Sequence, residues 1–192
     1  MQGIPAAIWM FGPNWIRSEI SLSTRECDRL IEIVSSAESD NKHGRGGGRL
    51  RRRRAGRRHK LTLTPQSAWM YDVLYQVVTD ANRERFRLLL SGIERAPEYV
   101  EQTAGSRPLR WRRDYRHRDI HDSCKLTVIC QLSDPSAYRG GDLQIFDDGI
   151  ATTVPARGGF FVLLGALFWR VTPVTRGVRR SLVSWFAGPR MR

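Results

Sequence analysis

A short polar stretch in the middle of the chain carries residue types that bind transition metals. His117 and Asp119 form a His-x-Asp pair, and His121 follows two residues later. Imidazole nitrogens and a carboxylate are ligands that suit zinc or iron. The alternative is a polar loop with solvated histidines, which we favour because short ligand-like clusters without a closed spacing pattern are weak motifs.

A second stretch, residues 42–60, has the chemistry of anion binding. No acidic residue lies between Asp40 and Asp72, so this basic segment carries most of the net charge of +13. Crowded guanidinium groups repel one another and are stabilised by phosphates or carboxylates. We therefore expect a polyanionic partner, which would be DNA, RNA or an acidic protein surface, although a solvated basic loop has the same pattern. The candidate contacts are Arg49, Arg51, Arg52, Arg53, Arg54, Arg57 and Arg58.

The elements that must position these residues begin with two helices. Ser23-Thr24-Arg25-Glu26 is a capping box, and the spacing of the apolar residues after it predicts a helix from about Thr24 to Ser36. Thr64-Pro65 is expected to open a second helix, with the proline in its first turn. The apolar stripe of this helix consists of Met70, Leu74, Val77, Val78 and Ala81. Between the helices, residues 44–58 are rich in glycine and arginine and predict a loop or mobile arm.

The second half of the chain, from about Glu98, is predicted to be mainly β. Short apolar segments alternate with turn residues such as Asp134-Pro135-Ser136 and Arg139-Gly140-Gly141-Asp142. The expected strands are Lys125–Leu132, Gly141–Phe146, Gly159–Leu164, Phe168–Val171 and Arg180–Phe186. Helices followed by an antiparallel β unit indicate one α+β domain over residues 1–192, in which the helices brace one face of a sandwich or barrel.

Three segments of the β half together resemble the prolyl-4-hydroxylase-like branch of the 2-oxoglutarate/iron(II) oxygenases. They are Lys125–Pro135, Tyr138–Leu143 and Arg170–Val183, and their order and spacing match those of the family. The resemblance covers about Glu98 to Pro189. It implies a double-stranded β-helix, which is a jelly-roll-like pair of facing sheets with its site in the open mouth.

The resemblance fails at the iron ligands. Active members of this superfamily hold iron with a His-x-Asp pair and a distant histidine. Arg112 stands at the first histidine, Asp114 keeps the carboxylate, and Trp169 stands at the distant histidine. Arginine has no lone pair to give at neutral pH, and an indole offers only a donor N–H. We therefore expect no catalytic residues and no bound iron at these degenerate positions.

The replacements also predict how the site is filled. The guanidinium of Arg112 would neutralise Asp114, which otherwise lies partly buried without a cation. Trp169 would fill the space of the missing histidine and stack on that guanidinium. The former metal site would thereby become a structural part of the core.

A competing alignment shifts the register by five residues. His117 and Asp119 then replace the missing pair, and His121 supplies a third nitrogen. This alignment loses the match at Trp111, so we keep it as the alternative.

The cosubstrate end resembles the family more closely. The resemblance implies that Arg179 holds the distal carboxylate of 2-oxoglutarate, with the hydroxyl of Ser181 beside it, and a bidentate arginine suits a carboxylate. Leu109 replaces a tyrosine that is often found on the other side of that pocket. The alternative is that Arg179 is an ordinary strand residue paired with a carboxylate of the protein.

Three functions follow from these patterns. We favour a non-catalytic oxygenase-like protein, without a cofactor, that acts in binding or in a large assembly such as a phage virion through its basic segment. One alternative is an active iron(II)/2-oxoglutarate-dependent dioxygenase, a hydroxylase with a rearranged metal site. The other is a 2-oxoglutarate-binding sensor that uses Arg179 and Ser181.

Composition predicts the compartment. The three cysteines are odd in number and form no CxxC pair, which suits a reducing environment without disulfides. The longest apolar run, Gly158–Trp169, has 12 residues, whereas a membrane-spanning helix needs about 20. The first residues lack the pattern of a signal peptide. We expect a cytoplasmic protein, or a virion protein if the chain comes from a phage, with no membrane partner.

Overall fold

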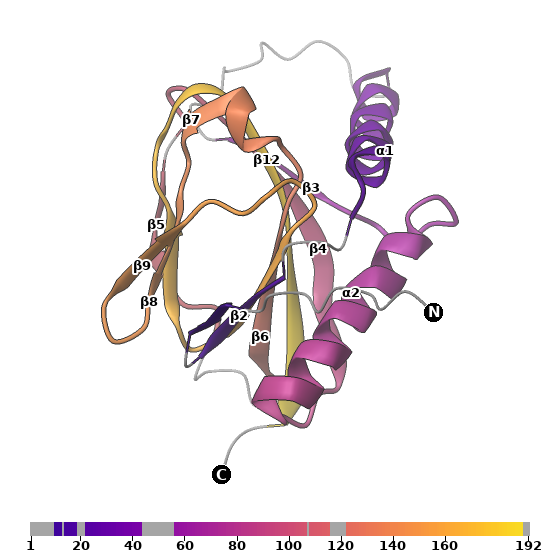
Figure 1. The fold of residues 1–192 in the computed structure, drawn as a ribbon. Coiled ribbons are helices and arrows are strands. Elements are labelled where there is room, and N and C mark those ends of the chain that lie inside the picture. The colour runs from indigo at the N-terminus through magenta and orange to yellow at the C-terminus, as the bar shows by residue number, and fades with distance from the viewer. Residues whose placement is uncertain are drawn as a thin grey trace, which may run out of the picture.

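A computed structural model describes residues 10–12, 14–18, 22–43, 56–106, 108–115 and 122–189. Two antiparallel β-sheets face each other, and the helices α1 (Thr24–His43) and α2 (Ala68–Ala81) lie on the side of the larger sheet (Figure 1). This arrangement agrees with the predicted α+β class, in which helices brace one face of a β unit. None of the helices in the described part of the chain is both long enough and apolar enough to cross a membrane.

The large sheet has eight strands and the small sheet has four. In spatial order the large sheet contains β1 (Met10–Gly12), β2 (Trp15–Ser18), β10 (Phe160–Leu164), β6 (Asp122–Gln131), β12 (Val174–Pro189), β4 (Gly92–Thr103) and β3 (Arg57–Lys60), and β7 (Tyr138–Gly140) pairs with β12. The small sheet contains β5 (Leu109–Arg112), β11 (Phe168–Val171), β8 (Leu143–Phe146) and β9 (Ile150–Thr153). A π-helical turn, η1 (Asn82–Phe86), follows α2, and a 3-10 turn, η2 (Pro135–Ala137), precedes β7.

The predicted capping box at the start of α1 is present. The backbone N–H of Glu26 donates to Ser23 Oγ at 3.2 Å, and the backbone N–H of Ser23 donates to Glu26 Oε2 at 2.7 Å. The helix continues to His43, beyond the predicted end at Ser36. The apolar stripe ends at Val34, but no glycine or proline follows until Gly44, so nothing in this stretch breaks the helix.

Helix α2 begins at Ala68, later than the predicted opening at Thr64 and Pro65. The reason is a side-chain turn, in which the backbone N–H of Thr64 donates to Ser67 Oγ at 2.9 Å. Serine and threonine side chains compete in this way with helical hydrogen bonds. The predicted apolar stripe is confirmed at its buried positions, which are Met70, Leu74, Val78 and Ala81, while Val77 is partly buried.

Side chains of the large sheet alternate between its two faces, and this alternation produces two apolar cores. On β6, Leu126, Val128 and Cys130 face the helices, whereas Ile129 faces the small sheet. The first core lies between the helices and the large sheet, and the second lies between the two sheets. The second core includes Trp169, and it is here that the resemblance places the site.

Each of the five predicted strands corresponds to an observed one, namely β6, β8, β10, β11 and β12, with shifted ends. The prediction of a loop over residues 44–58 was wrong at its end, because Arg57 and Arg58 belong to strand β3. Arg57 lies opposite Glu101 of β4, and Arg58 donates from Nη1 to Glu98 Oε2 at 3.0 Å. Charged cross-strand pairs stabilise this strand, whereas the prediction looked for apolar residues. Residues 44–55 lie outside the described residues.

Candidate functional site

Strand pairing brings together the residues that stand at the iron-ligand positions. Arg112 of β5 lies directly opposite Trp169 of β11. Asp114 follows β5, and its backbone N–H donates to the carbonyl of Gly165 at 3.0 Å. The three side chains therefore meet between the sheets, although 55 residues separate Asp114 from Trp169.

Both oxygens of the Asp114 carboxylate have partners in the protein. Trp169 Nε1 donates to Oδ2 at 2.9 Å, and Thr127 Oγ1 donates to the same oxygen at 3.0 Å. The Nε of Arg112 lies 3.7 Å from Oδ1. We call Arg112, Asp114, Thr127 and Trp169 the Asp114 cluster. The Asp114 side chain is only 8% exposed, so its carboxylate depends on these three protein contacts.

Arg112 also stacks on the indole of Trp169, with its guanidinium carbon 4.3 Å from the ring centroid. Burial lowers the pKa of Arg112, and the neighbouring Asp114 partly opposes this effect. The ion pair and the stacking expected from the sequence are thus both present. Thr127 is the member of the cluster that the sequence analysis missed, because its role depends on the face of β6 to which it points.

A second arginine–tryptophan pair, also missed from the sequence, lies at one end of the large sheet. The guanidinium carbon of Arg95 lies 3.7 Å from the ring centroid of Trp185, directly across from it on β12. Arg95 Nη1 pairs with Glu94 Oε1 at 3.1 Å. Arg58, which the sequence suggested as a polyanion contact, lies opposite Val100 of the inter-sheet core and pairs with Glu98. No sequence motif marks Arg95 or Trp185.

Arg179 lies on β12 and is 1% exposed. Its Nη1 donates to Gln102 Oε1 and to Ser181 Oγ, both at 3.1 Å. Its Nε and Nη2 are buried without a hydrogen-bond partner. Burial lowers the pKa of Arg179, and nearby Tyr138 and Asp142 oppose this effect.

The structure places Arg179 and Ser181 together, as the sequence suggested. No carboxylate among the described residues forms an ion pair with Arg179. Asp142 acts on Arg179 electrostatically without forming an ion pair, so the interpretation that Arg179 is paired with a protein carboxylate stays an alternative. A buried guanidinium with two nitrogens that lack a well-aligned acceptor, beside the hydroxyl of Tyr138, is chemically suited to receive an anion.

The fit of a metal ion to the Asp114 cluster is poor. The cluster offers one carboxylate, and its other three side chains present N–H or O–H groups to that carboxylate. Within the described ranges no group of three or more histidine, cysteine, aspartate or glutamate residues is arranged to hold a metal. The competing set, His117, Asp119 and His121, lies outside the described residues.

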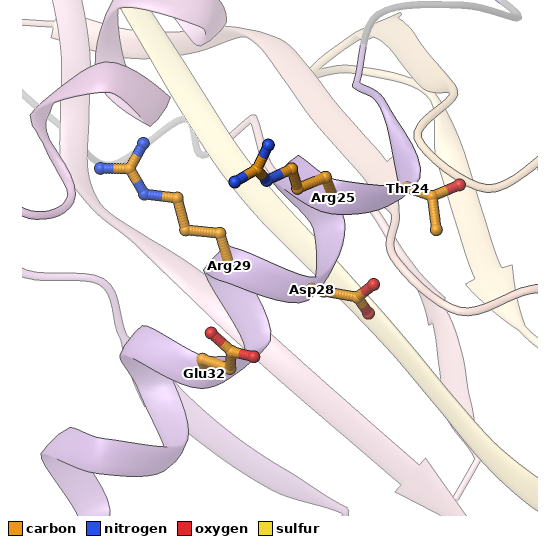
Figure 2. Close-up of a pocket in the computed structure, with 5 residues that line it drawn as sticks. All are labelled: Thr24, Arg25, Asp28, Arg29 and Glu32. Carbon is orange, nitrogen blue, oxygen red and sulfur yellow. The ribbon is translucent and has the colours of Figure 1, made fainter.

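A surface pocket lies on α1, away from the Asp114 cluster. Figure 2 shows the side chains that line it, which are Thr24, Arg25, Asp28, Arg29 and Glu32. Its charges balance, and Asp28 pairs with Arg157 while Arg29 stacks on Trp69. These contacts explain Asp28 and Arg29 as part of the packing of α1.

Comparison with known proteins identifies the architecture. No protein-family model matches the chain, and no curated protein matches it. Among solved structures, a prolyl-4-hydroxylase from Pseudomonas putida is 18% identical, with a TM-score of 0.64 over 93% of this chain and 94% of that one. A viral collagen prolyl hydroxylase from Paramecium Bursaria Chlorella virus-1, solved as a 2OG complex, is 13% identical, with a TM-score of 0.70 over 93% and 98%.

A prolyl hydroxylase from Trichoplax adhaerens, in complex with a hypoxia inducible factor peptide, gives the same TM-score of 0.70 at 12% identity, over 91% of this chain and 83% of that one. At such identities the similarity establishes the fold. The chain has the double-stranded β-helix fold of the prolyl-4-hydroxylase-like oxygenases.

Proposed function

We propose that this chain is a non-catalytic oxygenase-like protein that acts by binding and does not carry out iron-dependent oxidation. The observation that carries the proposal is the Asp114 cluster. An iron ion needs lone pairs from its ligands, and Asp114 directs its own toward Trp169, Thr127 and Arg112. Arg112 contributes a positive charge at the place of a metal ligand, which repels a divalent cation further.

The charge balance of the interior supports the same proposal. A facial triad of two histidines and one carboxylate needs a cation for charge neutrality, whereas here Arg112 supplies it. The stacking of Arg112 on Trp169 and of Arg95 on Trp185 fills the space around the carboxylate with large side chains. These contacts give the site a structural role in the inter-sheet core.

A small dicarboxylate is the ligand that the geometry favours as a second component of this function. Arg179 keeps two buried nitrogens, Nε and Nη2, without a well-aligned hydrogen-bond acceptor; Tyr138 lies beside them, and Ser181 and Gln102 fix the orientation of the guanidinium. A viral collagen prolyl hydroxylase of the same fold was solved with 2OG. We infer that this chain retains recognition of the 2-oxoglutarate class without the redox chemistry.

The basic segment, residues 42–60, supplies the third component, which is contact with a polyanion. Its charge density is the support for this role. The structure assigns Arg57 and Arg58 to strand β3, so the proposed contacts outside the sheet are Arg49 and Arg51–Arg54. The whole protein would then act as a binding or assembly component.

The experiment that tests the absence of oxygenase chemistry is an anaerobic titration with Fe(II) and 2-oxoglutarate. The full, metal-stripped chain is followed by the visible charge-transfer absorption of the chelated complex. We expect no band for the wild type and a saturable band for an Arg112→His/Trp169→His variant, in which the His-x-Asp pair and the distant histidine are restored. Circular dichroism establishes that the variant is folded.

A saturable band in the wild type would contradict the proposal. If that band disappeared in His117→Ala and Asp119→Ala and the wild type produced succinate, the protein would be an active dioxygenase with a rearranged metal site. A band that survived both substitutions would assign iron to Asp114 itself.

A further inference from the structure

The outer face of the small sheet carries an exposed aromatic cluster. Phe168 of β11 lies directly opposite Phe146 of β8, which in turn lies opposite Ile150 of β9. These residues are 43%, 51% and 58% exposed, respectively. Trp111 of β5 makes an edge-to-face contact with Phe146, with ring centroids 6.4 Å apart. We call Trp111, Phe146, Ile150 and Phe168 the aromatic face.

The strand pattern explains why these rings point outward. Alternate residues of β8 and β11, such as Ile145 and Trp169, are buried in the inter-sheet core, so their neighbours face solvent. The register between β5 and β11 shifts. Arg112 pairs with Trp169 and Leu109 with Val171, so two residues of β5 lie opposite a single residue of β11. This bulge inserts one extra residue, so that Arg110 and Trp111 both lie on the outer side.

The helices leave this face uncovered in the described part of the chain. Figure 1 shows α1 and α2 on the side of the large sheet, whereas β5, β8 and β9 lie on the opposite side. An exposed group of large apolar side chains in one sheet face is typical of an interaction surface. The question is therefore which partner has the matching chemistry.

Arginines alternate with the rings of the aromatic face. Arg170 places its guanidinium carbon 4.6 Å from the ring centroid of Trp111, and its Nε donates to Gln144 Oε1 at 2.7 Å. Arg113 lies 5.6 Å from the ring centroid of Phe168, and Arg110 is exposed. The four strands of the small sheet, all of which the structure describes, contain no acidic residue.

Two acidic residues lie at the edge of this face, in the turn between β8 and β9 that directly follows Phe146. Asp147 accepts hydrogen bonds from the side-chain and backbone N–H groups of Asn14, at 2.7 and 3.2 Å. Asp148 lies at the tip of the same turn, with a left-handed φ of 52°. Within the four strands, the rings of the face are thus accompanied by positive charge, and the two carboxylates stand in the turn beside Phe146.

We propose that the aromatic face binds single-stranded nucleic acid. This inference deepens the polyanion component of the proposed function and rests on it. Unpaired bases would stack on the exposed rings of Phe146 and Phe168, because every base has a flat π-surface. Arg110, Arg113 and Arg170 would hold the phosphates that flank these bases. Single-stranded nucleic acid is the partner that offers both unpaired bases for stacking and phosphates for the arginines.

Other occupants match the face less well. In a duplex the base faces are stacked on one another and cannot reach the rings, so a duplex would use the arginines alone. A second copy of this chain also carries a net charge of +13, and face-to-face contact would bring Arg110, Arg113 and Arg170 against their own copies. Charge complementarity therefore favours the nucleic acid.

The test is fluorescence anisotropy of the full chain with a labelled oligothymidine of about 20 nucleotides, a length that exceeds common site sizes, and with a mixed-sequence duplex of the same length. We expect the single strand to bind more tightly. Phe146→Ala and Phe168→Ala should each weaken its binding about 10-fold, because they remove one stacking ring. Leu63→Ala, which changes another exposed apolar residue of the described chain, is the matched control and should have no effect.

Arg113→Ala/Arg170→Ala supplies an independent measurement that does not alter the sheet core. The slope of log affinity against log salt concentration should fall by about 1 to 2, since up to two phosphate contacts are lost. Thermal unfolding of each variant shows that it is folded.

Three results would overturn the inference. Equal binding of the single strand by wild type and Phe146→Ala/Phe168→Ala would place stacking elsewhere. Wild-type self-association that this double variant abolishes, with nucleic acid affinity unchanged, would make the face a dimer interface. No binding of any nucleic acid would remove this inference and restrict the polyanion component to acidic protein surfaces, while the iron titration would still decide the non-catalytic proposal separately.

Discussion

A buried carboxylate without a metal needs protein partners, and Asp114 receives two hydrogen bonds and one ion-pair contact from three strands. Trp169 and Thr127 donate to one oxygen and Arg112 pairs with the other. The interaction is reciprocal, because Asp114 is also the only ion-pair partner of Arg112 among the described residues. The cluster therefore stabilises the fold only as a unit.

Replacing Asp114 with alanine should leave the half-buried Arg112 without its counter-charge and the Trp169 N–H without an acceptor. We expect the free energy of unfolding to fall by about 3–5 kcal/mol, measured by urea denaturation. Asp72→Ala, an exposed position on α2, is the control and should change it by less than about 0.5 kcal/mol. An Asp114→Ala protein as stable as the wild type would show that the cluster has no structural role.

Arg179 predicts a ligand effect that needs no metal. At a 2-oxoglutarate concentration about 100 times Kd, the free energy of unfolding should rise by about 2.7 kcal/mol. Arg179→Met should abolish this increase, and Arg179→Lys should weaken it because the planar guanidinium is lost. Arg180→Met is the matched control, since that neighbouring residue pairs with Glu101 on the other side of the strand. Ligand stabilisation that persists in Arg179→Met would place the ligand elsewhere.

Cys124 predicts a dependence of stability on alkaline pH. Burial raises the pKa of its thiol to about 12, above the value of about 8.5 for an exposed thiol. Its stabilising contribution is therefore complete below about pH 8.5 and decreases as the pH rises toward 12. Between pH 8.5 and 10.5, the wild type should lose about 2 kcal/mol more than Cys124→Ala. Parallel pH profiles in urea denaturation would refute the assignment.

Site residues that stand in a family motif could be predicted from the sequence. Site residues whose contacts depend on the register between strands could not. Arg112, Asp114 and Trp169 were found because the family pattern fixes their positions. Thr127 and the Arg95–Trp185 pair escaped, because their contacts depend on which β12 residue lies opposite which residue of β4 and β6. The register between distant strands cannot be predicted from a single sequence.

The same distinction holds for the elements. Strands with apolar runs, such as β10, and helices with an apolar stripe were predicted. Strand β4, which was not predicted, begins at Gly92, before the expected start of the β half at about Glu98, and its first part contains Glu94, Arg95 and Pro97. Those residues have low β-propensity, but β12 pairs with them and supplies Trp185 for Arg95 to cover. Tertiary pairing, rather than local pattern, determines such strands.

The capping box of helix α1 should contribute measurably to the free energy of unfolding. Ser23→Ala removes the acceptor for the Glu26 N–H and should lower the free energy of unfolding by about 1 kcal/mol. The backbone and side-chain hydrogen bonds from Ser23 lower the pKa of Glu26, so this contribution is present above about pH 4.3 and is lost as the pH falls further. The cost of Ser23→Ala in urea denaturation should therefore decrease in acid.

Ser36→Ala is the control for the capping box, because it changes an exposed serine of the same helix. It should leave stability unchanged or raise it slightly, since alanine has the higher helix propensity. If Ser23→Ala and Ser36→Ala had the same effect, the cap would contribute nothing to the fold.

For the molecule as a whole, the excess positive charge and the ion pairs that stabilise the fold lie in different parts of the chain. Several acidic residues of the described chain pair with arginines, as in Arg58–Glu98, Arg180–Glu101 and Arg157–Asp28. The sequence concentrates the excess positive charge of +13 in the basic segment, which contains no acidic residue. Fold stability and polyanion affinity should consequently respond to different substitutions.

Replacing Arg51–Arg54 with serine tests this separation directly. If the four guanidinium groups contact phosphates, the slope of log affinity for DNA against log salt concentration should fall by about 3 to 4. The free energy of unfolding should stay within about 0.5 kcal/mol of the wild type, or rise slightly because like charges are removed. Arg83→Ser, which removes an exposed arginine paired with Asp80, is the control and should leave the slope nearly unchanged. An unaltered slope in the Arg51–Arg54 variant would mean that the basic segment is solvated, and the arginines of the aromatic face would then have to account for any binding.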